Sequence, residues 1–212
     1  MSAITARSVA RTAYDHLPSG VRHQLRTTFV EAGSADQWLR ETMNRDLDAF
    51  FTSLPPSVTD VIEVSGDLRG GLPWMSYQSL CYPEFDICAP VVPAAEADLV
   101  ICEQVLEHVR DPHLAVRNLA GLVRPGGLVL VSTPFLVRLH DHPEDHWRFT
   151  PSGMRLLLEG GGLDVEWVRS WGNRRCVSAN LRRWAAYHPW RSLRNENDVP
   201  LVVWALARQP SA

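Results

Sequence analysis

The chain has 212 residues, of which 45% are hydrophobic, and a formal net charge of −3. This length predicts one compact domain with an appendage, and the hydrophobic fraction can fill a sizeable core. The charge excludes a general attraction to nucleic acid or to anionic membranes. Arginines do crowd the last quarter, where we interpret them as a solvated face: Arg174, Arg175, Arg182, Arg183, Arg191 and Arg194.

The cysteines and the apolar runs indicate the compartment. Cys81, Cys88, Cys102 and Cys176 do not have the close spacing of a zinc knuckle or a thioredoxin-like motif. Residues 1–13 contain no apolar run of signal-peptide length, and no run reaches the roughly 20 apolar residues of a membrane span. We therefore expect a reducing, cytoplasmic setting without membrane association.

Residues 1–55 are predicted to form an N-terminal helical cap, and residues 56–212 the core. Apolar side chains recur near the helical period in segments 21–29 and 38–51. Two consecutive prolines, Pro55 and Pro56, then end the helical region.

The core alternates short apolar runs with helical segments. Asp111 is expected to cap one helix and Thr150 to begin another, each followed by a proline that suits a first turn. This alternation predicts an α/β fold with a doubly wound, mostly parallel seven-stranded sheet. The expected strands are 58–64, 77–82, 85–88, 98–102, 128–132, 163–168 and 199–207.

Two motifs between residues 85 and 134 carry a family resemblance. Ala97–Val109 reads ADLVICEQVLEHV, and Arg124–Gly127 reads RPGG after the capped helix. Together with Val131–Pro134, they resemble the type 11 group of class I S-adenosylmethionine-dependent methyltransferases, over roughly residues 58–170. The resemblance implies a Rossmann-like methyltransferase fold and S-adenosylmethionine as the cofactor.

The resemblance also implies which residues meet the cofactor. Glu63 ends the first strand where the family places an acidic residue. Ser65 and Gly66 lie where glycines pass the methionine moiety. Glu103 and Gln104, at the end of the fourth expected strand, would flank the sulfonium end. Carboxylates suit this ligand, because its sulfonium and ammonium groups are cationic.

The adenosine half has a less regular match. An acidic residue after the second strand usually accepts hydrogen bonds from the ribose hydroxyls, but Cys81 or Tyr82 occupies that place here, with Glu84 the nearest carboxylate. Asp86 matches the acidic residue that meets the adenine amino group. The resemblance therefore implies Tyr82 and Asp86 as cofactor-binding residues.

The loop after the first strand departs from the family pattern. Ser65 and Asp67 replace two expected glycines, and Arg69 stands where another often lies. The dinucleotide fingerprint G-x-G-x-x-G is absent, which argues against a nicotinamide-linked dehydrogenase. Residues 66–76 are barely long enough for a helical crossover, and residues 70–73 (GGLP) would break a helix. We expect a loop or a single turn.

The loop after the fifth expected strand carries the candidate catalytic residues. A histidine here (His140, His142 or His146) could take a proton from an acceptor at neutral pH. Asp145 could orient that histidine, and Arg148 could hold a carboxylate or phosphate of the substrate. The loop is dense in polar groups: His140, Asp141, His142, Glu144, Asp145, His146, Trp147 and Arg148.

Structural alternatives exist for each of these residues. Arg148 and Asp145 could pair only with each other and fix the loop. The mixed spacing of the three histidines is not diagnostic of a metal, and we expect none. His108 is expected to cap the helix that follows it rather than to take part in catalysis.

These observations favour an enzyme that moves a methyl group from S-adenosylmethionine to an oxygen or nitrogen of a small-molecule acceptor. The alternative is a catalytically silent relative that binds the cofactor as a sensor or as a partner subunit, and the altered first loop motivates it. Nucleic acid is not expected as a partner, and the sequence is compatible with a homodimer. The segment 172–198 is expected to help to shape the acceptor pocket.

Overall fold

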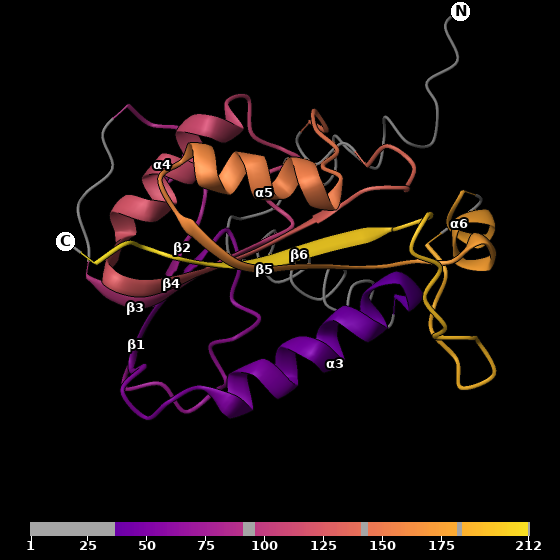
Figure 1. Ribbon diagram of the computed structural model, residues 1–212, viewed down its shortest axis with the longest axis horizontal. Helices are drawn as coiled ribbons and strands as arrows, with labels where there is room; N and C mark the ends of the chain where they lie inside the picture. Colours follow the sequence, from indigo (N-terminus) through magenta and orange to yellow (C-terminus); the bar gives the residue numbers. More distant parts are fainter. Residues whose placement is uncertain (1–36, 91–95, 141–143, 182–183, 212) are drawn as a thin grey trace, which may run out of the picture.

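A computed structural model describes residues 37–90, 96–140, 144–181 and 184–211 (Figure 1). The expected helical segment 21–29 lies outside these residues, as do Asp141, His142, Arg182 and Arg183. The helices are α3 (Trp38–Ser53), α4 (Pro112–Leu122), α5 (Pro151–Gly160) and α6 (Arg174–Asn180). The strands are β1 (Asp60–Val64), β2 (Ser76–Leu80), β3 (Ala97–Glu103), β4 (Val123–Pro134), β5 (Asp164–Trp171) and β6 (Val202–Arg208).

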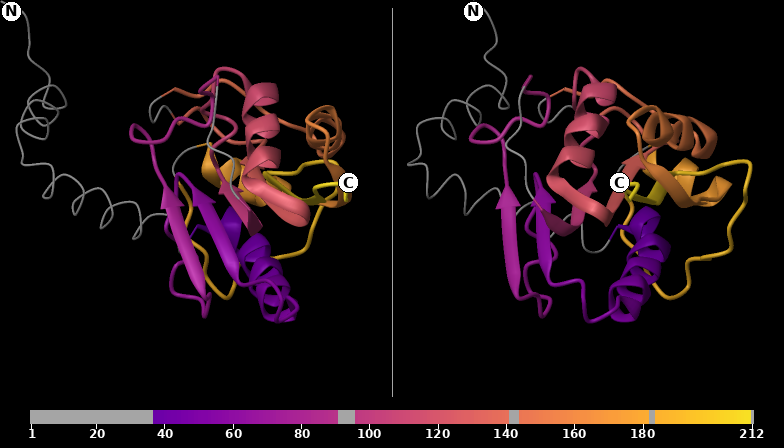
Figure 2. Two further views of the ribbon diagram at one scale, coloured as in Figure 1. Left: turned by 90° about the vertical axis from the view of Figure 1, so that its left-hand side faces the viewer. Right: turned by 60° about the vertical axis from the view of Figure 1, so that its left-hand side comes forward.

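The strands form one sheet in the order β2-β1-β3-β4-β6-β5. The four neighbours β2, β1, β3 and β4 pair in parallel, whereas β6 runs antiparallel to both β4 and β5. β2 and β1 stand side by side at one margin of the sheet (Figure 2). The doubly wound, mostly parallel sheet expected from the sequence is therefore confirmed.

Helices cover both faces of this sheet. α4 and α5 lie on one face and α3 lies on the other, as Figure 1 shows. Each face has its own apolar core, one built around α4 and α5 and the other around α3. Every residue of β3 is buried, because this central strand is covered on both sides.

Two helices begin where the sequence predicts. The side chain of Asp111 accepts a hydrogen bond from the backbone N–H of Leu114 at the start of α4 (2.9 Å). Thr150 accepts one from Gly153 at the start of α5 (3.0 Å). These caps satisfy N–H groups that the first turn of a helix leaves without partners. Both predicted starts are confirmed.

The described residues contain six strands rather than the seven expected. Residues 85–88 form turns, in which Phe85 N–H donates to the carbonyl of Cys81 and Cys88 N–H donates to the side chain of Asp86. The backbone of this segment is thus bonded locally and does not pair with a strand. The connection from β1 to β2 has no helix, as its glycines and proline predict.

A long segment, residues 172–201, joins β5 to β6 and contains α6. Its ends are held together, because Leu201 N–H donates to the carbonyl of Trp171 (2.8 Å) and Glu196 N–H donates to that of Gly172 (2.7 Å). A Cβ on Gly172 would stand only 2.1 Å from the carbonyl oxygen of Val199, so this close approach requires glycine. Among the described helices, none combines the length and the apolar character that a membrane crossing requires.

Candidate functional site

The carboxyl ends of β1, β3 and β4 meet at one edge of the sheet. The register pairs Glu63 of β1 with Ile101 of β3, and Glu103 of β3 with Ser132 of β4. Loops after parallel neighbours share an edge, and open α/β sheets bind ligands there. We name these loops the β1 loop (65–75), the β3 loop (104–111) and the β4 loop (135–150, of which 141–143 are not described).

Glu63, in β1, holds the β1 loop in place through hydrogen bonds. Its buried carboxylate accepts hydrogen bonds from the backbone N–H groups of Leu68 (3.1 Å) and Arg69 (2.9 Å), and from the hydroxyl of Tyr77 (2.7 Å). Burial and the adjacent Glu63 raise the pKa of Tyr77, so its phenol stays protonated and donates. A Cβ on Gly66 would stand 2.5 Å from Oε1 of Glu63. The loop therefore closes tightly around this carboxylate.

The residues directly after β1 and β3 share an unusual backbone conformation. Ser65 and Gln104 both have a φ of 57°, in the left-handed region that non-glycine residues rarely adopt. Ser65 N–H donates to the carbonyl of Leu80 (2.7 Å), and Gln104 N–H donates to that of Ser132 (2.8 Å). Such strained positions cluster at ligand-binding turns. Both turns therefore mark this edge as a candidate site.

Glu103, the last residue of β3, faces two arginines. Arg40 of α3 donates to its Oε2 (3.2 Å), and Arg69 of the β1 loop donates to its Oε1 (2.9 Å). The guanidinium of Arg69 also lies over the ring of Phe51, 4.9 Å from its centroid. The side chain of Glu103 is only 2% exposed. Its charge is therefore balanced by protein cations.

The expected adenosine-side residues lie after β2. Tyr82 is exposed, and the peptide bond that joins it to Pro83 is cis. Asp86 is also exposed, and one of its carboxylate oxygens accepts the backbone N–H of Cys88 (2.8 Å). Both side chains are therefore accessible to a ligand.

In the β4 loop, Asp145 is the centre of a polar group. The side chain of Arg148 donates to both of its carboxylate oxygens, and the backbone N–H of His140 donates to Oδ2 (3.0 Å). The ring Nδ1 of His140 also lies 3.0 Å from Oδ2. Arg148 in addition donates to the backbone carbonyls of Trp147 and Arg138, so it anchors the loop.

These contacts shift two pKa values in opposite directions. Burial raises the pKa of Asp145, but hydrogen bonds from Arg148 and from the backbone of His140 outweigh it and hold this pKa well below the ordinary value. The pKa of His140 is raised, first by the carboxylate of Glu107 and then, against burial, by the charge of Asp145. Asp145 is therefore a permanent anion beside His140.

The β3 and β4 loops bring together Glu107, His108 and His140, which we call the histidine cluster. Nε2 of His108 lies 3.6 Å and Nε2 of His140 lies 3.7 Å from Oε1 of Glu107. Glu107 is fully buried, and neither of its carboxylate oxygens accepts a hydrogen bond among the described residues. The rings of His140 and Trp184 pack edge to face, 5.6 Å between centroids.

Sequence reasoning missed Glu107 and assigned His108 wrongly. α4 begins at Pro112 with Asp111 as its cap, so His108 is not at the helix start; its ring contacts the carbonyl of Glu144 instead (2.5 Å). A carboxylate adjacent to a histidine, directly after a buried strand, is the signal that could have indicated a ligand-binding pair.

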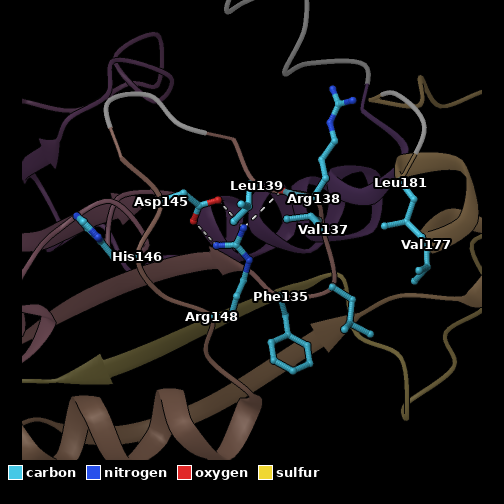
Figure 3. Close-up of a pocket in the computed structure, with 10 residues that line it drawn as sticks. Phe135, Val137, Arg138, Leu139, Asp145, His146, Arg148, Val177 and Leu181 are labelled. Atoms are coloured by element: carbon cyan, nitrogen blue, oxygen red, sulfur yellow. Dashed lines mark hydrogen bonds and ion pairs between the residues drawn. The ribbon is translucent and has the colours of Figure 1, made fainter.

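A cavity of about 460 Å³ lies beside the cluster (Figure 3). Asp145, His146 and Arg148 line it together with apolar side chains from the start of the β4 loop, from α6 and from Leu181 directly after α6. The lining residues are Phe135, Leu136, Val137, Arg138, Leu139, Asp145, His146, Arg148, Val177 and Leu181. The structure thus gathers His140, Asp145, His146 and Arg148 at one place.

Comparison with known proteins identifies the family. A family model described as "Methyltransferase domain" matches residues 35–196. The chain belongs to the methyltransferase-domain family. The resemblance to class I S-adenosylmethionine-dependent methyltransferases is thereby confirmed.

Individual relatives agree with this membership. The chain is 36% identical over 104 residues to a ubiquinone biosynthesis O-methyltransferase of Cupriavidus pinatubonensis, a match that covers 40% of the chain and 42% of the relative. The chain thus spans less than half the length of that relative.

Solved structures share the fold of this methyltransferase domain. A SAM-dependent methyltransferase from Archaeoglobus fulgidus has a TM-score of 0.55 at 13% identity, with 86% of the chain and 99% of that structure covered. Phosphoethanolamine N-methyltransferase 2 of Haemonchus contortus, in complex with S-adenosyl-L-methionine, has a TM-score of 0.53 at 10% identity, with coverage of 79% and 53%.

The edge of the methyltransferase domain fits a nucleoside cofactor in several respects. Gly66 brings the backbone against Glu63, and the left-handed turns at Ser65 and Gln104 aim the β1 and β3 loops along the edge. The exposed carboxylate of Asp86 can accept donors from a base. Arg69 leaves less room for a cofactor at this edge, because its guanidinium already binds Glu103 there.

Proposed function

We propose that the chain is an S-adenosylmethionine-dependent methyltransferase that methylates an oxygen or nitrogen of a small-molecule acceptor. The observation that carries this proposal is the cavity beside the histidine cluster, at the sheet edge where the family binds its cofactor. The name of the Cupriavidus relative, an O-methyltransferase, supports an oxygen acceptor.

The described residues divide the binding task between two parts of the edge. We propose that Glu63, Ser65, Gly66, Tyr82, Asp86, Glu103 and Gln104 surround the cofactor. When bound, S-adenosylmethionine supplies an electrophilic methyl group and leaves as a neutral thioether. The β4 loop then holds the acceptor in the apolar cavity, where alignment for in-line displacement supplies much of the rate enhancement.

The β4 loop also offers a base for the acceptor proton. His146 lines the cavity, its side chain is 31% exposed, and its Nε2 lies 3.3 Å from a carboxylate oxygen of Glu144. A neutral imidazole can take the proton of an attacking hydroxyl or amine, and the neighbouring carboxylate stabilises the imidazolium that forms. Arg148 and Asp145 keep the loop in place for this transfer.

Two measurements test the proposal. Calorimetric titration with S-adenosylhomocysteine is expected to show binding, and mass spectrometry is expected to show acceptor-dependent formation of S-adenosylhomocysteine over a panel of phenols, catechols and amines. The His146→Gln variant is expected to lose about 100-fold or more in kcat while still binding S-adenosylhomocysteine. An exposed histidine of α4 offers the matched control His113→Gln, which is expected to keep full activity.

The outcomes separate the two candidate functions. No binding of either S-adenosylmethionine or S-adenosylhomocysteine would overturn both. Firm binding without transfer to any acceptor would favour the catalytically silent relative, in which Arg40 and Arg69 hold the edge in a fixed state.

A further inference from the structure

In the histidine cluster, the carboxylate of Glu107 lies 3.6 Å and 3.7 Å from the two imidazoles, beyond hydrogen-bond distance. Both carboxylate oxygens of Glu107 lack a hydrogen-bond partner among the described residues, and the side chain is 0% exposed. A buried carboxylate without a partner costs several kcal/mol, so a cation is expected beside it.

The contacts of His108 determine which of its ring nitrogens faces Glu107. Nδ1 lies 2.5 Å from the backbone carbonyl oxygen of Glu144, which can only accept. Nδ1 therefore carries the proton, and Nε2 presents its lone pair toward Glu107, 3.6 Å away.

His140, the second ring of the cluster, lies beside Asp145. Its Nδ1 lies 3.0 Å from Oδ2 of Asp145, a carboxylate that Arg148 keeps ionised. Nε2 of His140 lies 3.7 Å from Oε1 of Glu107. His108 has the arrangement that is usual for a metal-binding histidine, because its Nδ1–H is donated to a backbone carbonyl and its Nε2 is offered.

From this arrangement we propose that Glu107, His108 and His140 bind a divalent transition-metal ion such as Zn²⁺. One ligand atom from each of the three residues can be chosen so that all lie within 4.8 Å of one another. Zinc–ligand bonds of about 2.0 to 2.1 Å place tetrahedral ligands about 3.3 Å apart, so a small inward movement of the two rings completes the site. Two histidines and one carboxylate are a donor set that zinc and iron(II) accept.

The surroundings fit a catalytic metal rather than a closed structural one. Three protein ligands leave a fourth position for water or substrate. Asp145 connects the two parts of the site, because it contacts His140 and also lines the cavity. The ring of Trp184 packs on His140 and excludes solvent from that side.

A metal ion at this position would bind an acceptor hydroxyl directly; this step rests on the proposed function. Coordination lowers the pKa of the hydroxyl, which releases its proton to His146 or to solvent. The oxygen then attacks the methyl carbon, an O–C bond forms, the S–C bond breaks, and its electron pair stays on sulfur. The metal keeps its charge throughout, and no electron is lost or gained.

Calorimetric titration of the full chain with Zn²⁺, after treatment with a chelator, tests the site itself. About one ion is expected to bind per chain, and binding is expected to raise Tm. Glu107→Gln keeps the size of the side chain but removes the charge, and is expected to weaken zinc binding by about 100-fold. His140→Gln is expected to do the same, whereas His113→Gln is expected to bind as the wild type does.

One experimental outcome would overturn the metal site without depending on whether a variant folds. If the chelated wild-type chain, folded by circular dichroism, shows no zinc binding above that of Glu107→Gln, the proposed metal site is wrong. Methyl transfer that persists undiminished in excess chelator would also overturn the metal while leaving the proposed function in place. Zinc binding without methyl transfer would support the metal site and contradict the proposed function.

Discussion

Two buried carboxylates of the same β-strand and its loop, Glu103 and Glu107, have opposite surroundings. Glu103 lies between Arg40 and Arg69, so its charge is balanced by the protein. Glu107 lies four positions further on, toward β4, and receives no hydrogen bond among the described residues. On the β1 side of the edge the carboxylate charge is thus balanced by arginines, whereas on the β4 side Glu107 has only the imidazoles of His108 and His140 beside it. A protein keeps such an imbalance where a ligand or a proton completes it.

The largest effect is expected on the β1 side. Glu103→Ala leaves Arg40 buried without its partner, and we expect a loss of about 3 kcal/mol in the free energy of unfolding, measured by urea denaturation. Asp48→Ala is the matched control: Asp48 is an exposed partner of Arg69, 3.4 Å away, and its removal is expected to cost less than about 0.5 kcal/mol. Equal losses in the two variants would contradict the comparison.

A second variant removes one hydrogen-bond donor from Glu63, the other buried carboxylate on the β1 side of the edge. Tyr77→Phe deletes the hydroxyl that donates to Glu63 but keeps the ring. A hydrogen bond to a charged acceptor is worth about 2 kcal/mol, so we expect a loss of that size in the urea experiment. Ser79→Ala is a suitable comparison, since its hydroxyl donates only to a neutral carbonyl, that of Gly66. If Ser79→Ala lost as much free energy of unfolding as Tyr77→Phe, the charge of Glu63 would not explain the loss.

The β4 side should respond with the opposite sign. Without metal, Glu107→Gln replaces a buried charge that accepts no hydrogen bond among the described residues by a neutral amide, so we expect a chain more stable than the wild type by about 1 kcal/mol. The measurement is Tm in excess chelator, repeated with Zn²⁺, where the wild type should become the more stable protein. A strongly destabilised Glu107→Gln in chelator would show that the carboxylate already has its cation.

The smallest effect concerns a third buried carboxylate on the same strand. Asp98, at the start of β3, accepts the backbone N–H groups of Thr59 (2.6 Å) and Asp60 (3.0 Å). Burial opposes ionisation, but these bonds and Arg124 lower its pKa. Its ionised form therefore stabilises the fold above the unfolded pKa of about 3.9, and this stability is lost as pH falls through the folded pKa.

The Asp98→Asn variant checks this sign. We expect it to be less stable than the wild type by about 1 kcal/mol near neutral pH, because the amide cannot replace the charged acceptor. The difference should shrink as urea denaturation is repeated at progressively lower pH. A difference that stays constant into the acid range would mean that ionisation of Asp98 contributes nothing.

The fold was largely predictable from the sequence, because its signals are local. Apolar runs located six strands, and Asp111 and Thr150 located two helix starts. Residues 85–88 were wrong as a strand, because the Asp86 side chain bonds the backbone two residues on and favours a turn.

The site was predictable only where its residues are neighbours in sequence. Asp145 and Arg148 are three positions apart, and their pairing was considered from the sequence alone. Glu107 and His140 lie in different loops, and they meet only because β3 and β4 are adjacent. The partners of Glu103 likewise come from α3 and the β1 loop, which no local pattern connects.

The two ends of residues 172–201 are held close together by hydrogen bonds, so this segment is suited to exchange with that of a relative. Backbone hydrogen bonds of Trp171, Gly172, Glu196 and Leu201 bring the two ends together. The intervening residues include Trp184, on the histidine cluster, and Val177, in the cavity wall. Replacing this segment by that of a relative would test whether it determines acceptor preference. In such chimaeras the sheet, including β5 and β6, would stay unchanged.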